Sequence, residues 1–308
     1  VVPGEGYYAR SDEFVPQVGG EGEDEGRTEL MTAAAVGNTE RVVELLAAPG
    51  LDVNAADGAG RRALMWAALG GRTEAVTALL AAPGLEVNAP DGRGITALMA
   101  AALGGHTVTV TALLAAPGLE ANAADDAGWT AFMLAAMQGH AETVRALLAA
   151  PGHEVNAAAG EGNTALMAAA SRGHTETVKA LLAAPGLNVN AADGVGNTPL
   201  MRAAAGGHAE TVMALLAAPG LDVNVTTADG LTALMQAASG GHTEVAMALL
   251  AATGLDVNAA TGGGATALLV AATRGHTEMV TALLAATGLD VNAATGGGTT
   301  ALMWAAEG

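Results

Sequence analysis

Residues 193–224 read DGVGNTPLMRAAAGGHAETVMALLAAPGLDVN, and near copies of this stretch recur along the chain at a fixed spacing of 34 residues. A Thr at the start of each T-A-L-M-like run marks the register, at Thr28, Thr96, Thr130, Thr164, Thr198, Thr232, Thr266 and Thr300, with Arg62 in its place once. A fixed period predicts a stack of units that each contact only their neighbours. Thr28 and Thr300 are eight periods apart, which predicts eight full repeats and a truncated ninth.

A single repeat, residues 163–190, predicts two helices and a hairpin. Thr164 can cap a first helix of about two turns, and Gly173 can end that helix in the left-handed conformation. The second helix opens near Thr175, and its apolar residues Val178, Leu181 and Leu182 recur at three and four residues. The Pro-Gly pair that follows stops this helix, and a D-G-x-G run then favours an extended arm with a tight turn.

These motifs resemble the ankyrin repeat. The resemblance rests on T-A-L-M-x-A-A, G-H-T-E-x-V and D-V-N-A-x-D-x-x-G, covers residues 26–308 and includes the T-P-L-M of residues 198–201. It implies an all-α repeat fold, an ankyrin-type solenoid of helix-turn-helix-hairpin units. The chain departs from the family pattern regularly: Met or Leu replaces the His after T-P-L, Ala usually replaces the Pro, and a P-G or T-G insertion lengthens the period by one. The hydrogen bonds of the missing His are therefore in doubt.

Composition narrows the function. The chain has 31 acidic and 12 basic residues, a formal net charge of -19 and no Cys. A charge of this sign repels phosphate backbones and anionic lipid, so nucleic acid and membrane insertion are not expected. Residues 94–119 carry no charge, but glycines and threonines interrupt this stretch and argue against a membrane span. No secretory signal is recognised, and a cytoplasmic or other intracellular location and a monomer are expected.

Residues 1–25 are predicted to form an acidic disordered tail, followed by the array at residues 26–308. The tail has seven acidic residues against Arg10, and few apolar residues at helical spacing. It is either a solvated leader or a binding segment that uses Tyr7, Tyr8 and Phe14. The chain begins without Met and stops within a repeat, which suggests a fragment of a longer protein.

The residues that could carry chemistry are better explained by structure. Six of the seven His stand in G-H pairs, one per repeat, and stacked repeats lie too far apart for such residues to share a metal ion. The D-x-N-x-x-D-G run near Asp52 lacks the later ligands of a calcium loop, and the D-G-x-G runs never continue into a phosphate-binding motif. No nucleophile has a base in its sequence context. No enzyme, metal or cofactor is expected.

A partner is expected where the repeats differ and face solvent, at the residue before the capping Thr and at the fourth and seventh residues after it. Large apolar residues gather at these positions in repeats two to four, with Arg beside them, which is the composition of interface hot spots. The predicted partner-binding residues are Arg61, Trp66, Leu69, Arg93, Ile95, Leu103, Trp129, Leu134 and Met137. Replacing Trp66 and Trp129 with Ala should weaken binding without unfolding the array. The alternative is that these apolar residues are scattered by drift.

The sequence therefore predicts a non-catalytic protein-interaction scaffold. The family resemblance implies that a concave helical face and the hairpin tips contact the protein partner. Two alternatives stay open. The array could regulate or target a larger enzyme or channel whose catalytic part lies outside this fragment, or it could be a duplicated array without a dedicated partner.

Overall fold

The computed structural model describes residues 26–303, and these are divided into two compact units, one of residues 26–160 and the other of residues 161–303. Each unit is described by itself below. The tail predicted at residues 1–25 lies outside the described residues, and the continuous array from residue 26 to residue 308 stays a prediction.

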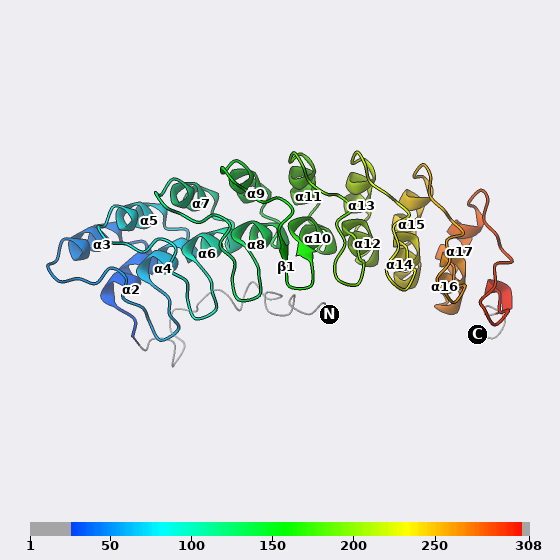
Figure 1. Cartoon of the computed structure of the whole chain (residues 1–308), viewed down its shortest axis with the longest axis horizontal. Coiled ribbons are helices and arrows are strands. Elements are labelled where there is room, and N and C mark those ends of the chain that lie inside the picture. Colours follow the sequence, from blue (N-terminus) through cyan, green and yellow to red (C-terminus); the bar gives the residue numbers. More distant parts are fainter. Residues whose placement is uncertain (1–25, 304–308) are drawn as a thin grey trace. The chain divides into compact units, whose positions relative to one another are not determined.

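Unit 1 holds four helix pairs. In Figure 1 its first helices form one row and its second helices form another. The pairs are α2 (Glu29–Val36) and α3 (Thr39–Leu46), α4 (Ala63–Leu69) and α5 (Thr73–Leu80), α6 (Ala97–Leu103) and α7 (Thr107–Leu114), and α8 (Ala131–Met137) and α9 (Ala141–Leu148). Along the unit, α2, α4, α6 and α8 contact one another in turn, as do α3, α5, α7 and α9. This is the one-dimensional stacking that a repeat protein requires.

Unit 2 repeats the same arrangement. Its pairs are α10 (Ala165–Ser171) and α11 (Thr175–Leu182), α12 (Pro199–Ala205) and α13 (Ala209–Leu216), α14 (Ala233–Gly240) and α15 (Thr243–Leu250), and α16 (Ala267–Thr273) and α17 (Thr277–Leu284). Two short strands, β1 (Ala158–Ala159) and β2 (Asn163–Thr164), flank the boundary between the units. Eight helix pairs between residues 26 and 303 confirm the predicted repeat count and the ankyrin-type solenoid.

The repeat chosen for the prediction folds as expected. Thr164 Oγ1 accepts a hydrogen bond from Met167 N at 3.3 Å and so caps α10, and Gly173 has a φ of +71°. In α11 the side chains of Val178 and Leu181 are buried, whereas Leu182 is half-buried. The helix ends at Leu182, before the Pro-Gly pair, because Ala183 already closes its last turn. The predicted apolar stripe is therefore narrower than its sequence spacing suggested.

Methionines fill the core at the position where the family pattern has His. Met99, Met133, Met167, Met201 and Met235 are all buried. The capping Thr is then the polar group that fixes the start of each first helix, through a bond to the backbone nitrogen three residues later. An apolar residue in place of the His thus removes a buried polar group without leaving the helix start uncapped.

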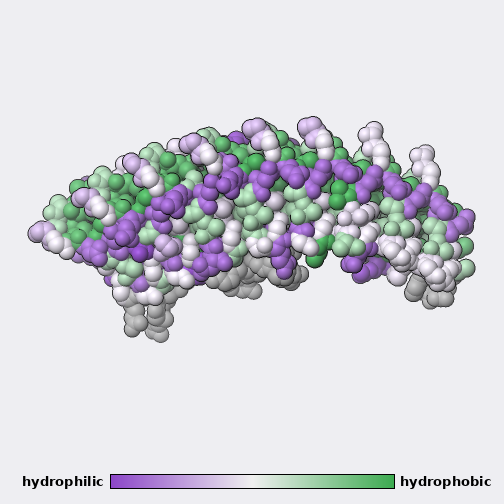
Figure 2. All heavy atoms as spheres, in the orientation of Figure 1, coloured by the Kyte–Doolittle hydropathy of each residue, from purple (hydrophilic) through white to green (hydrophobic). Residues whose placement is uncertain are grey.

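In six repeats an asparagine, which follows Val in five of them and Ala121 in one, joins its repeat to the next. Its Nδ2 donates to a glycine carbonyl one repeat on, at 2.7–2.8 Å: Asn54 to Gly84, Asn88 to Gly118, Asn122 to Gly152, Asn190 to Gly220, Asn224 to Gly254, and Asn258 to Gly288. In most of these steps its Oδ1 also accepts a backbone N–H of that next repeat, as from Glu86 at 2.9 Å. Figure 2 shows a hydrophilic band that crosses the repeats within each unit. These side-chain bonds fix the spacing of the hairpins.

The histidines of the G-H pairs are structural. The ring Nε2 of His106 donates to the carbonyl oxygen of Leu69 at 3.0 Å, and His208 makes the same bond to Ser171. Both acceptors lie in the first helix of the preceding repeat, where the last carbonyls lack helical partners. These contacts confirm the prediction that they are turn residues.

His153 replaces a Leu of the extended arm and is half-buried. Its ring meets Phe132 edge-on, with the centroids 4.0 Å apart, and its Nε2 is buried without a hydrogen-bond partner in the described part of the chain. Burial lowers the pKa of His153, although the nearby Glu154 opposes this. The folded unit therefore disfavours the charged ring.

Unit 1 is expected to lose stability as the pH falls below about 6.5, the ordinary pKa of histidine. Because the pKa of His153 is lower in the folded state, its ring takes up a proton more readily in the unfolded chain. Protonation at lower pH therefore favours unfolding. His153→Leu should flatten this dependence, which thermal melts between about pH 8 and pH 5 would measure. An unchanged slope in the variant would contradict this assignment.

Hairpins in which Thr replaces the Asp of the repeat have fewer side-chain hydrogen bonds. Asp91 accepts two backbone bonds, from Arg93 N and Ile95 N, both at 2.9 Å. Thr227 stands in the corresponding place and accepts only one, from Leu231 N at 3.1 Å. The Thr hydroxyl here accepts one backbone hydrogen bond, whereas the Asp carboxylate accepts from two N–H groups.

Amide exchange is therefore expected to be faster in residues 227–231 and 261–265 than in residues 91–95. Fewer side-chain bonds hold the former, which lowers the free energy of local opening. Thr227→Asp should slow exchange in its own hairpin, and hydrogen exchange followed by mass spectrometry checks this. Equal exchange in all of these hairpins would show that the side-chain bonds do not control local opening.

Among the described residues, the structure has no helix with the length and apolar character needed to cross a membrane. The uncharged stretch at residues 94–119 is divided between α6 and α7.

Candidate protein-binding surface

All nine predicted partner-binding residues lie in unit 1, on its first helices and hairpins. Trp66 and Leu69 belong to α4, Leu103 to α6, and Leu134 and Met137 to α8. The remaining four occupy the hairpins that precede these helices: Arg61, Arg93, Ile95 and Trp129.

The expectation that these apolar side chains face solvent is wrong for most of them. Buried residues are Trp66, Ile95, Leu103, Trp129, Leu134 and Met137. Every residue of α6 and of α8 is buried, so these seven-residue helices present no stripe that faces solvent. Leu69 and Arg61 are half-buried, and Arg93 is exposed. Trp66→Ala and Trp129→Ala are thus expected to cost folding stability, and they do not isolate binding.

Trp66 shows how such burial arises. The guanidinium carbons of Arg27 and Arg61 lie over its ring, 4.2 and 4.3 Å from the centroid. The indole Nε1 donates to Asp57 Oδ2 at 3.2 Å. A cation over an aromatic ring is attracted by the ring quadrupole. The tryptophan therefore orders two arginines and has little surface of its own left to contact a partner.

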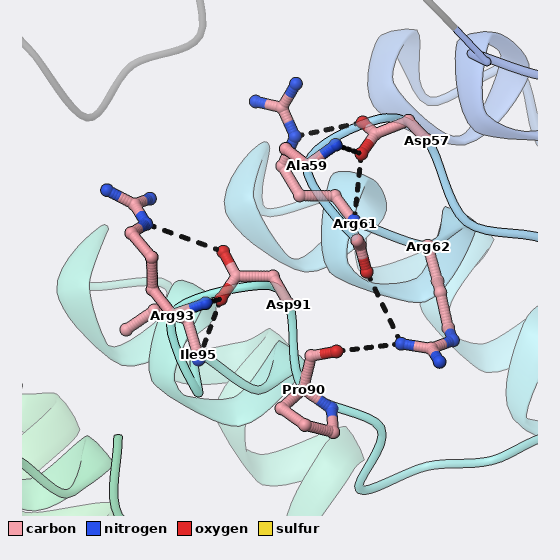
Figure 3. Close-up of polar contacts among 9 residues, drawn as sticks. Asp57, Ala59, Arg61, Arg62, Pro90, Asp91, Arg93 and Ile95 are labelled. Carbon is pink, nitrogen blue, oxygen red and sulfur yellow. Dashed lines mark hydrogen bonds and ion pairs between the residues drawn. The ribbon is translucent and has the colours of Figure 1, made fainter. Parts of the chain in front are cut away.

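Asp57 organises the hairpin of repeat two. Its Oδ1 accepts from Ala59 N at 3.0 Å and Arg61 N at 2.9 Å, and its Oδ2 accepts from Arg61 Nε at 2.9 Å (Figure 3). The Asp57 side chain is 0% exposed, whereas that of Arg61 is 15% exposed. The negative charge is therefore interior, and the positive charge lies outside it.

In repeat three, a buried carboxylate again lies beside a more exposed arginine. Asp91 accepts the two backbone bonds described above, and Arg93 Nε lies 3.8 Å from its Oδ2. Arg93 is 44% exposed at the side chain and Asp91 only 3%. In Figure 3 the Arg61 and Arg93 side chains extend from their hairpins, each beside its own carboxylate. We call Arg61 and Arg93, with the carboxylates of Asp57 and Asp91 beside them, the basic hairpin face.

Arg62 joins the two hairpins and was not among the predicted site residues. It stands in place of the capping Thr, but its side chain makes no capping hydrogen bond to α4. Its Nη1 instead donates to Gly60 O at 3.3 Å and to Pro90 O at 2.8 Å, which reaches the next hairpin. The sequence feature that could have identified Arg62 is its departure from the Thr of the repeat pattern. Arg62 fixes the relative position of the two hairpins that carry Arg61 and Arg93.

Comparison with known proteins identifies the family. The model for ankyrin repeats, built of three copies, matches residues 11–91, 83–159, 151–227, 207–295 and 256–308. The chain belongs to the ankyrin repeat family. The crystal structure of the human ASB11 ankyrin repeat domain is similar, with a TM-score of 0.66 and 29% identity over 75% of this chain and 100% of that one. No curated protein matches the chain.

Ankyrin repeats are protein-interaction modules and are typically non-catalytic. In the described residues, no group of three or more His, Cys, Asp or Glu side chains is placed to hold a metal ion.

The ankyrin array carries a second charged cluster, in unit 2. Asp193 accepts from the backbone of Val195 at 3.0 Å and Asn197 at 2.8 Å, from Asn197 Nδ2 at 3.1 Å, and from Arg202 Nη2 at 2.5 Å. Burial by itself raises the pKa of Asp193, but the bonds from Asn197, Arg202 and Val195 outweigh it, so the pKa lies below its ordinary value. Arg202 is mostly buried, and its ion pair with Asp193 stabilises this hairpin.

Proposed function

We propose that this ankyrin array is a non-catalytic scaffold that binds a protein partner through the hairpins and first helices of repeats two to four. The basic hairpin face carries this proposal. Of the two charged residues among the predicted ones, Arg93 is 44% exposed at the side chain and lies 3.8 Å from the buried Asp91 carboxylate, whereas Arg61 is 15% exposed and donates to the buried carboxylate of Asp57. Ordered side chains lose less entropy when they bind, which favours recognition.

The charge of this face specifies the partner's chemistry. Its outermost groups are guanidinium groups, whereas the chain as a whole has a net charge of -19. An acidic segment of a partner is therefore attracted to this face and repelled by most of the remaining surface. Guanidinium groups bind carboxylates through two parallel hydrogen bonds, which adds geometric selectivity. The expected ligand is a protein surface or peptide rich in Asp and Glu.

Binding is expected to weaken when the arginines of the basic hairpin face lose their charge. We would capture proteins from a lysate on the array, and on a variant with Arg61→Gln and Arg93→Gln. The control has Arg145→Gln and Lys179→Gln, which remove the same charge from the second helices, where each residue pairs with an exposed Glu. A partner lost only by the hairpin variant supports the proposal. A partner retained by it, with the array folded, contradicts this choice of surface.

The regulatory alternative uses the same surface. If the array targets or regulates a larger enzyme or channel, the acidic partner segment lies in that larger protein, and a full-length transcript would reveal it. An intracellular location and a monomeric state are also proposed, and sedimentation of the purified chain tests the latter.

A further inference from the structure

We infer that unit 2 carries a second binding surface, a groove between α13 and α15 that takes a basic amphipathic helix of a partner protein. This ligand has the opposite charge to the acidic segment proposed for the basic hairpin face. The inference goes beyond the proposed function and does not depend on it.

The groove between α13 and α15 is apolar. It has a volume of about 480 Å³ and lies between two second helices that are neighbours in unit 2 (Figure 1). Met213 and Leu216 line it from α13, Leu221 and Val223 line it from the arm that follows α13, and Ala248 lines it from α15. Every lining residue is apolar except Thr253. A hollow with this lining favours apolar side chains of a ligand.

Two exposed methionines stand on these helices, at a position that is polar in most repeats. Met213 and Met247 are 53% and 52% exposed, and each is the fifth residue of its helix. The fifth residues of the other second helices are Val43, Thr77, Thr111, Arg145, Lys179 and Thr281. Packing of the repeat therefore does not require an apolar side chain here. Methionine is flexible and adapts to apolar partners of different shape, and neighbouring exposed apolar side chains are typical of interaction sites.

The charge around the groove has one sign. Residues 203–273 contain no Lys or Arg. They contain five acidic residues, all exposed: Glu210, Asp222, Asp229, Glu244 and Asp256. Asp222 stands between Leu221 and Val223, which line the groove. Glu210 and Glu244 each precede one of the methionines by three residues, so they share a helix face with it.

The glutamates of α13 and α15 lack the cation that neutralises their counterparts. In α11, Lys179 Nζ donates to Glu176 Oε1 at 2.8 Å, and Arg145 pairs with a glutamate in the same way in α9. Met213 and Met247 take the place of these cations, and Glu210 and Glu244 form no ion pair in the part of the chain that the structure describes. Lys179 interacts electrostatically with Glu210, but its hydrogen bond goes to Glu176. Negative charge beside the groove is therefore available to a ligand.

These features together specify the occupant. An apolar helix face fills the groove, and Lys or Arg residues on the flanks of that face meet the exposed carboxylates. A helix with acidic flanks is repelled. The same carboxylates repel an anionic lipid surface, so the occupant is a protein segment and not a membrane.

Methyl NMR of the unaltered chain tests the groove directly. The probe is a synthetic helical peptide with leucine on one face and lysine on the other. In a chain labelled with carbon-13 at the methionine methyl groups, this peptide should shift the signals of Met213 and Met247 strongly, and those of the buried Met201 and Met235 little. Met213→Leu and Met247→Leu assign the two signals. A peptide with glutamate in place of every lysine should shift neither.

The apolar contribution is measured with the double variant Met213→Thr, Met247→Thr. Threonine occupies this position in α17 as Thr281, so the change suits the helix. The variant should bind the peptide at least about tenfold more weakly than the natural chain. The matched control is Val43→Thr, which makes the same kind of change at the same exposed position of α3 in unit 1 and should leave the affinity unchanged.

The electrostatic contribution is measured with Glu210→Gln, Asp222→Asn, Glu244→Gln. Asn188 already occupies the place of Asp222 one repeat earlier and accepts the same backbone bond, so the amide fits there. The variant should bind the peptide several-fold more weakly and with a smaller salt dependence. The control removes the same charge from the corresponding exposed positions of unit 1, with little effect on affinity: Glu40→Gln, Glu74→Gln and Glu120→Gln.

Unshifted Met213 and Met247 signals, or equal shifts with the acidic peptide, would overturn the inference. Equal affinity of the natural chain and the threonine variant would do the same. Because the methyl measurement uses the unaltered chain, it decides the matter even if a variant unfolds. The Arg61→Gln, Arg93→Gln variant should bind the peptide as the natural chain does, so failure of the groove and failure of the basic hairpin face are separate results.

Discussion

Replacing Gly94 with alanine is expected to lower the free energy of unfolding of unit 1 by about 3 kcal/mol. Gly94 has a φ of +82°, and a Cβ there would lie 2.8 Å from both the Cα of Asp125 and the N of Asp126. Those atoms belong to the backbone of the next hairpin, in which Asp126 N donates a hydrogen bond to Arg93 O at 3.2 Å. No side chain can rotate away to relieve this contact.

Gly84 provides the matched control. Its φ is +76°, but a Cβ at this position would have no atom within 4 Å. Gly84→Ala should therefore cost about 1 kcal/mol, from backbone strain alone. Chemical denaturation of the two variants measures the difference, which reports how closely the hairpins approach each other. Equal losses would mean that the hairpins separate easily and do not form a fixed surface.

Asp193→Ala is expected to destabilise unit 2 by about 3–5 kcal/mol. It removes the carboxylate that holds one hairpin and leaves the mostly buried Arg202 without its charge partner. Thr227→Ala changes the corresponding position of the next repeat, where a single bond is lost, and should cost about 1 kcal/mol. Denaturant titrations of both variants check this ratio, and similar losses would contradict the importance assigned to the Asp193–Arg202 pair.

The same carboxylate contributes a pH dependence. Because the pKa of Asp193 is lowered in the folded state, its stabilising contribution is complete above the unfolded value and is lost as the pH falls below about 4. Asp193→Asn should remove this part of the acid sensitivity.

The sequence predicted the repeat well because each local signal agrees with the period. Thr164 and Gly173, for example, begin and end α10 as expected. The Asn side chains that join the repeats were not predicted, since their acceptors lie about 30 residues away and depend on how closely successive repeats stack. The period and the capping residues are therefore enough to predict a single repeat. The contacts between neighbouring repeats can be identified only from the tertiary structure.

The prediction of the binding residues was only partly correct, for a related reason. Spacing identified positions on the first helices and hairpins, but it could not show that the ring of Trp66 would be covered by Arg27 and Arg61. The apolar composition of repeats two to four thus indicated packing at least as much as binding. Arg62 was overlooked because a charged residue at a cap position has no fixed meaning until its acceptors, Gly60 O and Pro90 O, are known.

The most direct test of the proposed binding surface is the dissociation constant of a captured partner for three folded proteins. These are the natural chain, the Arg61→Gln, Arg93→Gln variant and the Arg145→Gln, Lys179→Gln control. We expect the hairpin variant to bind at least about tenfold more weakly, with a smaller salt dependence, and the control to match the natural chain. Equal affinity of all three would contradict the assignment of binding to the basic hairpin face.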